Sequence, residues 1–188
     1  MNLVARADWR SLTDGGAEQC TLWQRGDGHA IEGVAIRLEG GYWRFDYRVE
    51  LNALWLTERA EVRWRRAKAS GRILLDHDGN GGWTVDGVPS APLSGCRDVD
   101  FGFSPVTNLM PIRRLGSEAG AEVGVRAAWL RFPALEVTAA EQTYTRLGAG
   151  RVRYESSSGY RTELRISDVG FVTHYPELWE PLGAQEGS

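Results

Sequence analysis

The segment YWRFDYRVEL, residues 42–51, alternates apolar and charged side chains along nearly its whole length. Its odd-numbered positions, from Trp43 to Leu51, are all apolar, and its even-numbered positions, from Arg44 to Glu50, are all charged. Successive side chains of a β-strand point to opposite faces of the sheet, so the pattern predicts a strand with one buried and one solvated face. Antiparallel sheets commonly show this one-sided burial.

The same period-two pattern recurs along the chain. In AEVRWRRA, residues 60–67, Val62 and Trp64 alternate with charged side chains. Further segments that read as strands are TLWQRG (21–26), GRILLD (71–76), AEVGVRAAWLRF (121–132), ALEVTAAEQTYTRL (134–147), RVRYES (151–156) and YRTELRIS (160–167). Glycine-rich turn signals occur at 26–28, 40–41, 78–82 and 86–87. Short strands separated by such turns are typical of antiparallel hairpins.

Helical patterns are scarce. Only the region from Pro105 to Leu115 and the segment YPELWEPL, residues 175–182, could hold short helices. We therefore predict an all-β fold and a single domain over residues 1–188, with a disordered tail at 182–188. Because sheets of more than about ten strands tend to curl or close, we expect one large curved antiparallel sheet that forms an open or incomplete barrel.

Composition excludes several classes of protein. The net charge is −3 and the pI is about 5.7, whereas a nucleic-acid-binding domain is normally basic. No run reaches the roughly 18 apolar residues of an integral membrane segment. The N-terminus, MNLVARADWRS, lacks the basic and apolar regions of an export signal, so we expect a cytoplasmic protein with Cys20 and Cys96 reduced.

The sequence predicts no metal and no cofactor. In LDHDGNGGWTVDG, residues 75–87, Asp76, Asp78 and Asn80 match the first positions of a calcium loop, but Gly87 stands where a bidentate glutamate is required. A tight hairpin explains the segment. The three histidines show no metal-ligand spacing, and no nucleophile motif accompanies them. We therefore assign no catalytic residue.

The least ordinary segment is VDFGFSPVTNLMPIRRLG, residues 99–116. A strand leads into it with acidic side chains on one face, a proline ends that strand, and a Thr-Asn pair suits a turn or helix cap. The bent connection then returns two adjacent arginines toward the acids. The candidate ligand-binding residues are Asp98, Asp100, Thr107, Asn108, Arg113 and Arg114.

Two interpretations of this segment compete. In the first, a partly buried Asp–Arg network pins the bend to the sheet, because the guanidinium fork binds carboxylates through paired hydrogen bonds. In the second, one arginine stays free to bind an anionic or polyol head group. We expect Arg113 and Arg114 to differ, one stabilising the fold and the other contributing to ligand capture.

The segment LSGCRDVDFGFSPVTNLMPIRRL, residues 93–115, resembles the signature of a bacterial family of putative glycolipid-binding proteins, once known as a domain of unknown function. Similar segments extend the resemblance from about Trp23 to Trp179: YWRFDYRVELNALWLTERAEV (42–62), GWTVDG (82–87), QTYTRL (142–147) and GFVTHYPELW (170–179). The resemblance implies an open barrel of antiparallel strands, similar to the periplasmic carriers of bacterial lipoproteins. It implies no catalytic role for the signature residues.

The sequence leaves three functions open. The first is non-catalytic binding of a glycolipid or other amphipathic small molecule in the concave face of the sheet, with Arg113 or Arg114 at the head group. The second is a hydrolase or isomerase that uses Asp98 and Asp100, which lie ~7 Å apart on one strand face, as acid and base together with the arginines. The third is an interaction module in which an exposed sheet edge or the C-terminal segment docks an unidentified protein partner; the C-terminal segment could equally close one end of the barrel.

Overall fold

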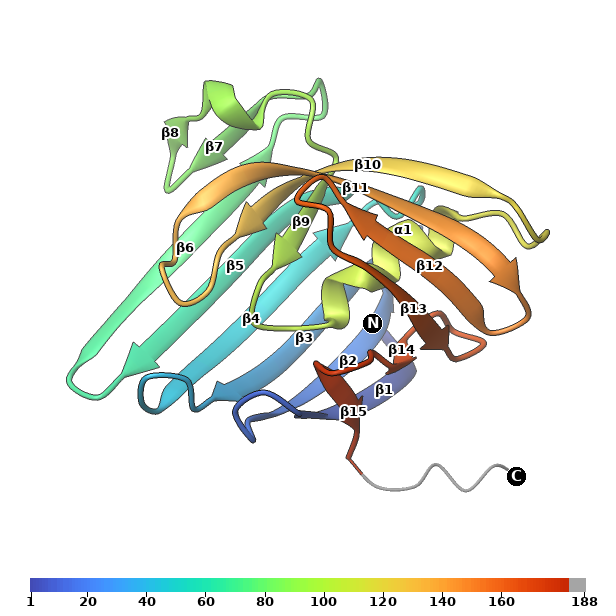
Figure 1. Cartoon of the computed structure of the whole chain (residues 1–188). Coiled ribbons are helices and arrows are strands. Elements are labelled where there is room, and N and C mark those ends of the chain that lie inside the picture. Colours follow the sequence, from blue (N-terminus) through green and yellow to red (C-terminus); the bar gives the residue numbers. More distant parts are fainter. Residues whose placement is uncertain (183–188) are drawn as a thin grey trace.

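The computed structural model describes residues 1–182, in which fifteen strands form two sheets (Figure 1). The first sheet has nine strands in the order β15 (Trp179–Pro181), β1 (Asn2–Ser11), β2 (Ala17–Arg25), β3 (Gly28–Arg37), β4 (Trp43–Leu51), β5 (Thr57–Arg66), β6 (Ala69–His77), β7 (Trp83–Val85) and β8 (Val88–Pro89). The second has six strands in the order β14 (Val172–His174), β13 (Arg161–Ile166), β12 (Arg151–Ser156), β11 (Val137–Gly148), β10 (Glu122–Leu130) and β9 (Asp98–Phe101).

The predicted all-β architecture is confirmed, and all pairs but one are antiparallel. The six-stranded sheet curls into a half-barrel above the long strands of the large sheet (Figure 1). Its edge strand β9 runs parallel to β10, a pairing that the sequence does not indicate. The predicted tail lies, from residue 183 onward, outside the described residues.

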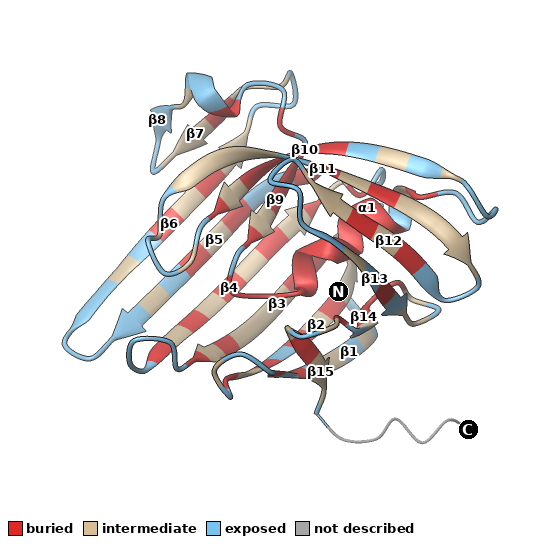
Figure 2. Ribbon diagram, in the orientation of Figure 1, coloured by how far each residue is buried: buried red, intermediate tan, exposed pale blue. Residues whose placement is uncertain are grey.

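The helical elements are short. They are the 3-10 helices η1 (Ala91–Leu93) and η2 (Val106–Asn108) and the α-helix α1 (Leu109–Arg114). The last two confirm the helix predicted between Pro105 and Leu115. Helix α1 is mostly buried and lies in the hollow of the half-barrel, between the two sheets (Figures 1 and 2). No helix within residues 1–182 is long and apolar enough to cross a bilayer.

The prediction of a helix in YPELWEPL is wrong. Tyr175 and Trp179 form a β-bridge, and Trp179 then starts β15, which pairs with the C-terminal end of β1. The physical reason is burial: in the extended chain that pairs with β1, the Trp179 side chain lies in the hydrophobic core. The sequence does not predict two of the long strands, β1 and β3. Alanines fill the inward positions that precede Trp9 in β1, and Gly33 and Ala35 weaken the inward apolar pattern of β3.

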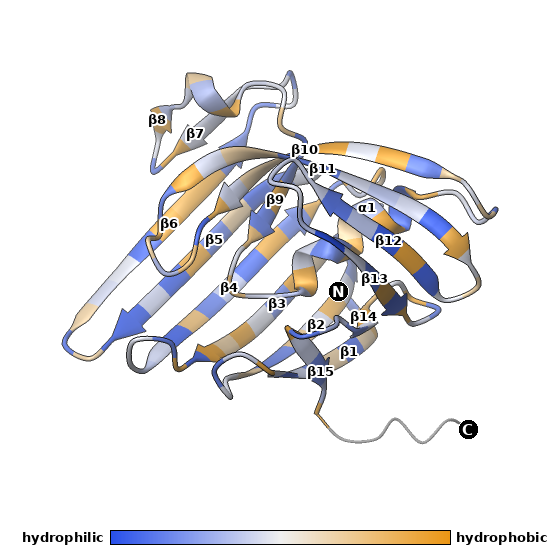
Figure 3. Ribbon diagram, in the orientation of Figure 1, coloured by the Kyte–Doolittle hydropathy of each residue, from blue (hydrophilic) through white to orange (hydrophobic). Residues whose placement is uncertain are grey.

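Alternation of apolar and charged side chains along β4 and β5 matches the predicted faces (Figure 3). The inward side chains meet aromatic rings from the β9 region: Phe45 stacks on Phe103 with ring centroids 4.0 Å apart, and Tyr47 contacts Phe101 edge-on at 5.5 Å. Buried residues of both sheets form one cluster. The concave face of the large sheet is therefore filled by the protein's own side chains.

A buried carboxyl connects the two sheets. Glu18 Oε1 accepts hydrogen bonds from the hydroxyls of Tyr47, on β4, and Ser104, which follows β9. The tyrosine ring reaches Glu18 by crossing Gly33, where a Cβ atom would lie 2.2 Å from the Tyr47 hydroxyl. Glu18 Oε2 is buried without a hydrogen-bond partner among the described residues. Burial raises the pKa of Glu18 from 4.5 to about 7, although both hydroxyls oppose the shift.

This arrangement predicts a pH dependence of stability. The pKa of Glu18 is higher in the folded than in the unfolded chain, so protonated Glu18 stabilises the fold. This contribution to the free energy of unfolding is fully present below pH 4.5 and is lost as the pH rises through about 7. A shift of this size corresponds to about 3 kcal/mol in the free energy of unfolding. Urea unfolding at pH 4.5 and pH 8 should therefore show a smaller loss of stability at high pH in Glu18→Gln than in the wild type.

Glu118→Gln is the matched control, since Glu118 is exposed. It should leave the pH dependence of unfolding unchanged. An identical loss of stability between the two pH values in Glu18→Gln and the wild type would contradict an ionisable Glu18 at the sheet junction.

Candidate ligand-binding pocket

A pocket of about 370 Å³ opens in the hollow of the half-barrel. One wall comes from the inner face of β10, β11 and β12, and the opposite wall comes from the segment after β9 and from the chain around β15. Two of the six predicted ligand-binding residues, Asp100 and Asn108, line this pocket.

The floor of the pocket is a buried polar network. Asp100 accepts hydrogen bonds from Thr107 Oγ1 at 2.9 Å and from Gln142 Nε2 at 2.6 Å. The Tyr144 hydroxyl lies 2.9 Å from Asn108 Oδ1 and 3.1 Å from Gln142 Oε1, so its single proton serves one of them at a time. The network fixes the orientation of a carboxylate and two amides that face the pocket.

Aromatic side chains form the walls above this floor. The rings of Tyr154, Tyr160 and Tyr175 lie with centroids 6.2 to 6.5 Å apart, and Trp129 and Trp179 complete the lining. Burial raises the pKa of Tyr154 and of Tyr175, so both hydroxyls stay protonated at neutral pH. The sequence does not single out these residues, because they lie far along the chain from the signature segment and only the tertiary structure brings them together at the pocket.

Thr107 occupies a supporting position. Its hydroxyl accepts a hydrogen bond from the Phe101 backbone N–H at 3.2 Å while it donates to Asp100, and Thr107 itself does not line the pocket. Asn108 Nδ2 donates to the Pro105 carbonyl at 2.8 Å, which leaves its oxygen toward Tyr144. The turn predicted from the Thr-Asn pair thus orients the two polar groups of the pocket floor.

Asp98 and Arg114 form the Asp–Arg pair that the sequence suggested. Arg114 Nη1 and Nη2 donate to the two carboxylate oxygens of Asp98 at 2.8 and 2.5 Å, and Nη1 also donates to the Trp55 carbonyl at 2.7 Å. The pair ties α1 to β9 and to the loop between β4 and β5. Both carboxylate oxygens of Asp98 and both terminal nitrogens of Arg114 form hydrogen bonds within the protein, and neither side chain lines the pocket.

Arg113 belongs neither to the Asp98–Arg114 pair nor to the polar network at the pocket floor. Its guanidinium is exposed, packs over the Trp55 ring at 4.7 Å and donates to the Val169 carbonyl at 3.2 Å. It does not line the pocket that contains Asp100. The structure thus places Arg113 and Arg114 in different environments, although they are adjacent in sequence.

The paired-carboxylate arrangement required by the enzyme hypothesis does not form. Asp98 and Asp100 share one face of β9, but Asp98 is bound by Arg114 and only Asp100 reaches the pocket. Burial raises the pKa of Asp98, although Arg114 opposes the shift. Burial also raises the pKa of Asp100, against the hydrogen bonds of Thr107 and Gln142.

The loop that resembles a calcium site is the predicted hairpin. It joins β6 to β7, and Asp78 Oδ1 accepts hydrogen bonds from the backbone N–H groups of Asn80 at 2.7 Å and Gly82 at 2.9 Å. The carboxylate therefore closes the turn. No group of three metal-ligating side chains occurs within residues 1–182.

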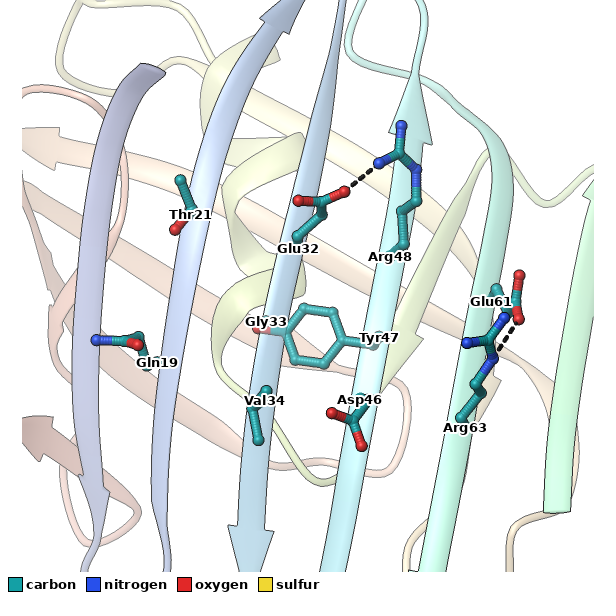
Figure 4. A pocket seen from close by; sticks show the side chains of 10 residues that line it. All are labelled: Gln19, Thr21, Glu32, Gly33, Val34, Asp46, Tyr47, Arg48, Glu61 and Arg63. Atoms are coloured by element: carbon teal, nitrogen blue, oxygen red, sulfur yellow. Dashed lines mark hydrogen bonds and ion pairs between the residues drawn. The ribbon is translucent and has the colours of Figure 1, made fainter. Parts of the chain in front are cut away.

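A second hollow, of about 400 Å³, lies on the outer face of the large sheet (Figure 4). Its charged side chains pair with one another: Arg48 with Glu32, and Arg63 with Glu61. The Tyr47 ring lies across Gly33 at its centre (Figure 4). Because these charges satisfy each other at a solvated surface, this hollow is a weaker candidate than the half-barrel pocket.

The clasp formed by Asp98 and Arg114 should dominate local stability. We expect Arg114→Ala to lower the free energy of unfolding by about 3–5 kcal/mol, because it leaves a buried carboxylate without its partner. Arg113→Ala should cost less than about 1 kcal/mol, the range for an exposed cation over an aromatic ring. Urea unfolding of both variants measures the difference.

The double variant Asp98→Ala/Arg114→Ala serves as the control, because it removes both charges together. It should be more stable than Arg114→Ala alone. Equal destabilisation by Arg113→Ala and Arg114→Ala would contradict the division of roles between the two arginines.

Comparison with known proteins agrees with the signature segment. The family described as "Putative glycolipid-binding" matches residues 6–181, a range that includes most of both sheets and the pocket. The crystal structure of a DUF1089 family protein from Pseudomonas aeruginosa is similar, with a TM-score of 0.79 and 32% sequence identity, over 93% of this chain and 95% of that chain. No curated protein sequence matches significantly. The chain belongs to the putative glycolipid-binding family.

Proposed function

We propose that the protein binds the hydroxyl-rich head group of a glycolipid, or of a similar amphipathic small molecule, in the half-barrel pocket and catalyses no reaction on it. The observation that carries this proposal is a single cavity with aromatic walls above a floor of one carboxylate and two amides. Its volume of about 370 Å³ falls in the range of small-molecule sites, ~300–1,000 Å³.

The chemistry of this lining suits a sugar ring. The C–H faces of a pyranose are apolar and can pack against the rings of Tyr154, Tyr160 and Tyr175, while its hydroxyls lie at the ring edge. A hydroxyl can donate to Asp100, and the side-chain amides of Asn108 and Gln142 add polar contacts at fixed positions. Neutral tyrosines and a single carboxylate do not favour an anionic head group in this pocket.

The location of the head group differs from the arrangement expected for a hollow carrier. Aromatic side chains fill the space above the concave face of the large sheet, including Phe45, Phe101 and Phe103. An acyl chain therefore has no room there. We place the head group inside the half-barrel pocket and the tail toward its mouth, beside the turn of Ser156 to Ser158 and the partly exposed Tyr160.

The family description supports the glycolipid class of ligand. The structure supports a binding role over a catalytic one, because the pocket contains one carboxylate from the signature segment and its neighbour Asp98 is held by Arg114. Asp100, Asn108 and Gln142 are the proposed head-group contacts. Thr107 is a proposed positioning residue that acts through Asp100.

The proposal predicts selective binding of alkyl glycosides. Titration with octyl glucoside below its micelle-forming concentration should change the fluorescence of Trp129 and Trp179, which line the pocket. Tyr160→Ala should raise the Kd about 2- to 13-fold, because it removes one aromatic wall worth about 0.5–1.5 kcal/mol. Tyr42→Ala is the matched control: Tyr42 is also an exposed tyrosine, lies outside the pocket and should leave the Kd unchanged.

Two further ligands separate head-group recognition from recognition of the tail. An octyl ether of tetraethylene glycol carries the same tail without a sugar, and methyl glucoside carries the sugar without the tail. We expect the ether to bind more weakly than octyl glucoside. Equal affinity for the ether and the glucoside, or an equal effect of both tyrosine substitutions, would refute a sugar-selective pocket.

A further inference from the structure

A separate pocket of about 350 Å³ lies at the opposite end of the half-barrel from the pocket that contains Asp100. It is bordered by the C-terminal end of α1, by the turn between β11 and β12, and by the turn between β13 and β14. The two pockets share no lining residue. On β11, Gln142 lines the first and Arg146 the second, and the buried Tyr144 lies between them.

Two arginines from different elements line this second pocket: Arg113 from the end of α1 and Arg146 from β11. Each is held by a backbone carbonyl. Arg113 Nη1 donates to the Val169 carbonyl, and Arg146 Nε donates to the Gly116 carbonyl, both at 3.2 Å. The Trp55 ring further restrains Arg113. Both guanidinium groups are thus oriented and still have N–H groups to donate.

Neither arginine has a carboxylate within 4.0 Å among residues 1–182. By contrast, Arg126 on the same sheet forms an ion pair with the carboxylate of Glu141. The acidic residue in the lining, Asp168, is exposed and pairs with neither arginine. The pocket is therefore lined by two cationic groups, neither of which forms an ion pair with a carboxylate within residues 1–182.

The remaining lining suits a compact polar ligand. Ser167 Oγ accepts a hydrogen bond from the Phe171 N–H at 3.2 Å, which leaves its own proton for a further acceptor. Ser117 adds a second hydroxyl, and Gly148 and Gly150 contribute backbone without side chains. The lining thus offers hydrogen-bond donors around two positive charges.

We propose that this pocket at the end of α1 binds a phosphate or sulfate group through Arg113 and Arg146. The planar guanidinium fork matches tetrahedral oxyanions and gives charge-assisted hydrogen bonds. The site is distinct from the head-group pocket, so the protein can hold an anionic group and a hydroxyl-rich head group at opposite ends of the half-barrel. The anion can come from a free phosphate or from a phosphorylated lipid.

Calorimetric titration with inorganic phosphate at low ionic strength tests the site. Arg113→Gln and Arg146→Gln should each raise the Kd at least 10-fold. Arg6→Gln is the matched control, because Arg6 is exposed, lacks a carboxylate partner among residues 1–182 and lies outside the pocket; it should change the Kd less than 2-fold. Asp168→Asn should lower the Kd a few-fold, because it removes the one negative charge of the lining.

Two additional measurements complete the test. Amide chemical shifts of the wild-type protein should change on phosphate addition at Gly148, Gly150 and Gly170, which locates the site without any substitution. Co-sedimentation with phosphatidylcholine vesicles that do or do not contain phosphatidic acid identifies a lipid source: Arg113-dependent binding of the acidic vesicles alone supports the site with a lipid phosphate as its ligand.

Binding of free phosphate alone supports the same site with a soluble ligand. Absence of both kinds of binding overturns the proposal, as does an equal effect of Arg6→Gln and Arg113→Gln. Octyl glucoside binding should be unchanged in the Arg113 and Arg146 variants. The phosphate proposal can therefore be refuted while the head-group proposal stands, and the head-group proposal can be refuted while the phosphate proposal stands.

Discussion

The buried ion pair of Asp98 and Arg114 joins the parts of the molecule that create its pockets. Asp98 belongs to β9, Arg114 to α1, and the same guanidinium donates to the Trp55 carbonyl in the loop between β4 and β5. Beside the pair, the Thr57 N–H donates to the carbonyl of Arg97, just before β9, and the Thr57 hydroxyl accepts a hydrogen bond from the Val99 N–H in β9. One end of the half-barrel is thereby fixed to the large sheet, and α1 is held inside the hollow.

The position of α1 divides the half-barrel into two ends with different chemistry. The segment that precedes the helix carries Asn108 into an aromatic pocket with neutral tyrosines, whereas the end of the helix carries Arg113 into a pocket with Arg146. The apolar side chains of Leu109, Met110 and Ile112 are buried in the core, and the two pockets share no lining residue. The signature segment thus contains the Asp98–Arg114 ion pair and also contributes residues to the linings of both pockets.

Buried polar groups connect these parts with defined geometry. Glu18 links both sheets through Tyr47 and Ser104, and Ser104 also accepts a hydrogen bond from the Val106 N–H at the start of η2. The same turn leads directly to Asn108. Glu18 is therefore connected, through two hydrogen bonds and one helical turn, to the wall of the pocket that contains Asp100. Such networks favour one arrangement of the chain because each unpaired buried group would be costly.

The sequence alone determined most of the long strands with their buried faces and the short helix after Pro105, and it offered the pairing of an aspartate with an arginine as one of two interpretations, because these depend on side-chain alternation and on contacts close along the chain. It did not determine the division into two sheets, the parallel pairing of β9 or the closure of β1 by β15. Backbone hydrogen-bonding groups are the same in every strand, so distant partners leave little local signal. For the same reason, only the tertiary structure separated Arg113 from Arg114 and brought Tyr154, Tyr160 and Tyr175 together over Asp100.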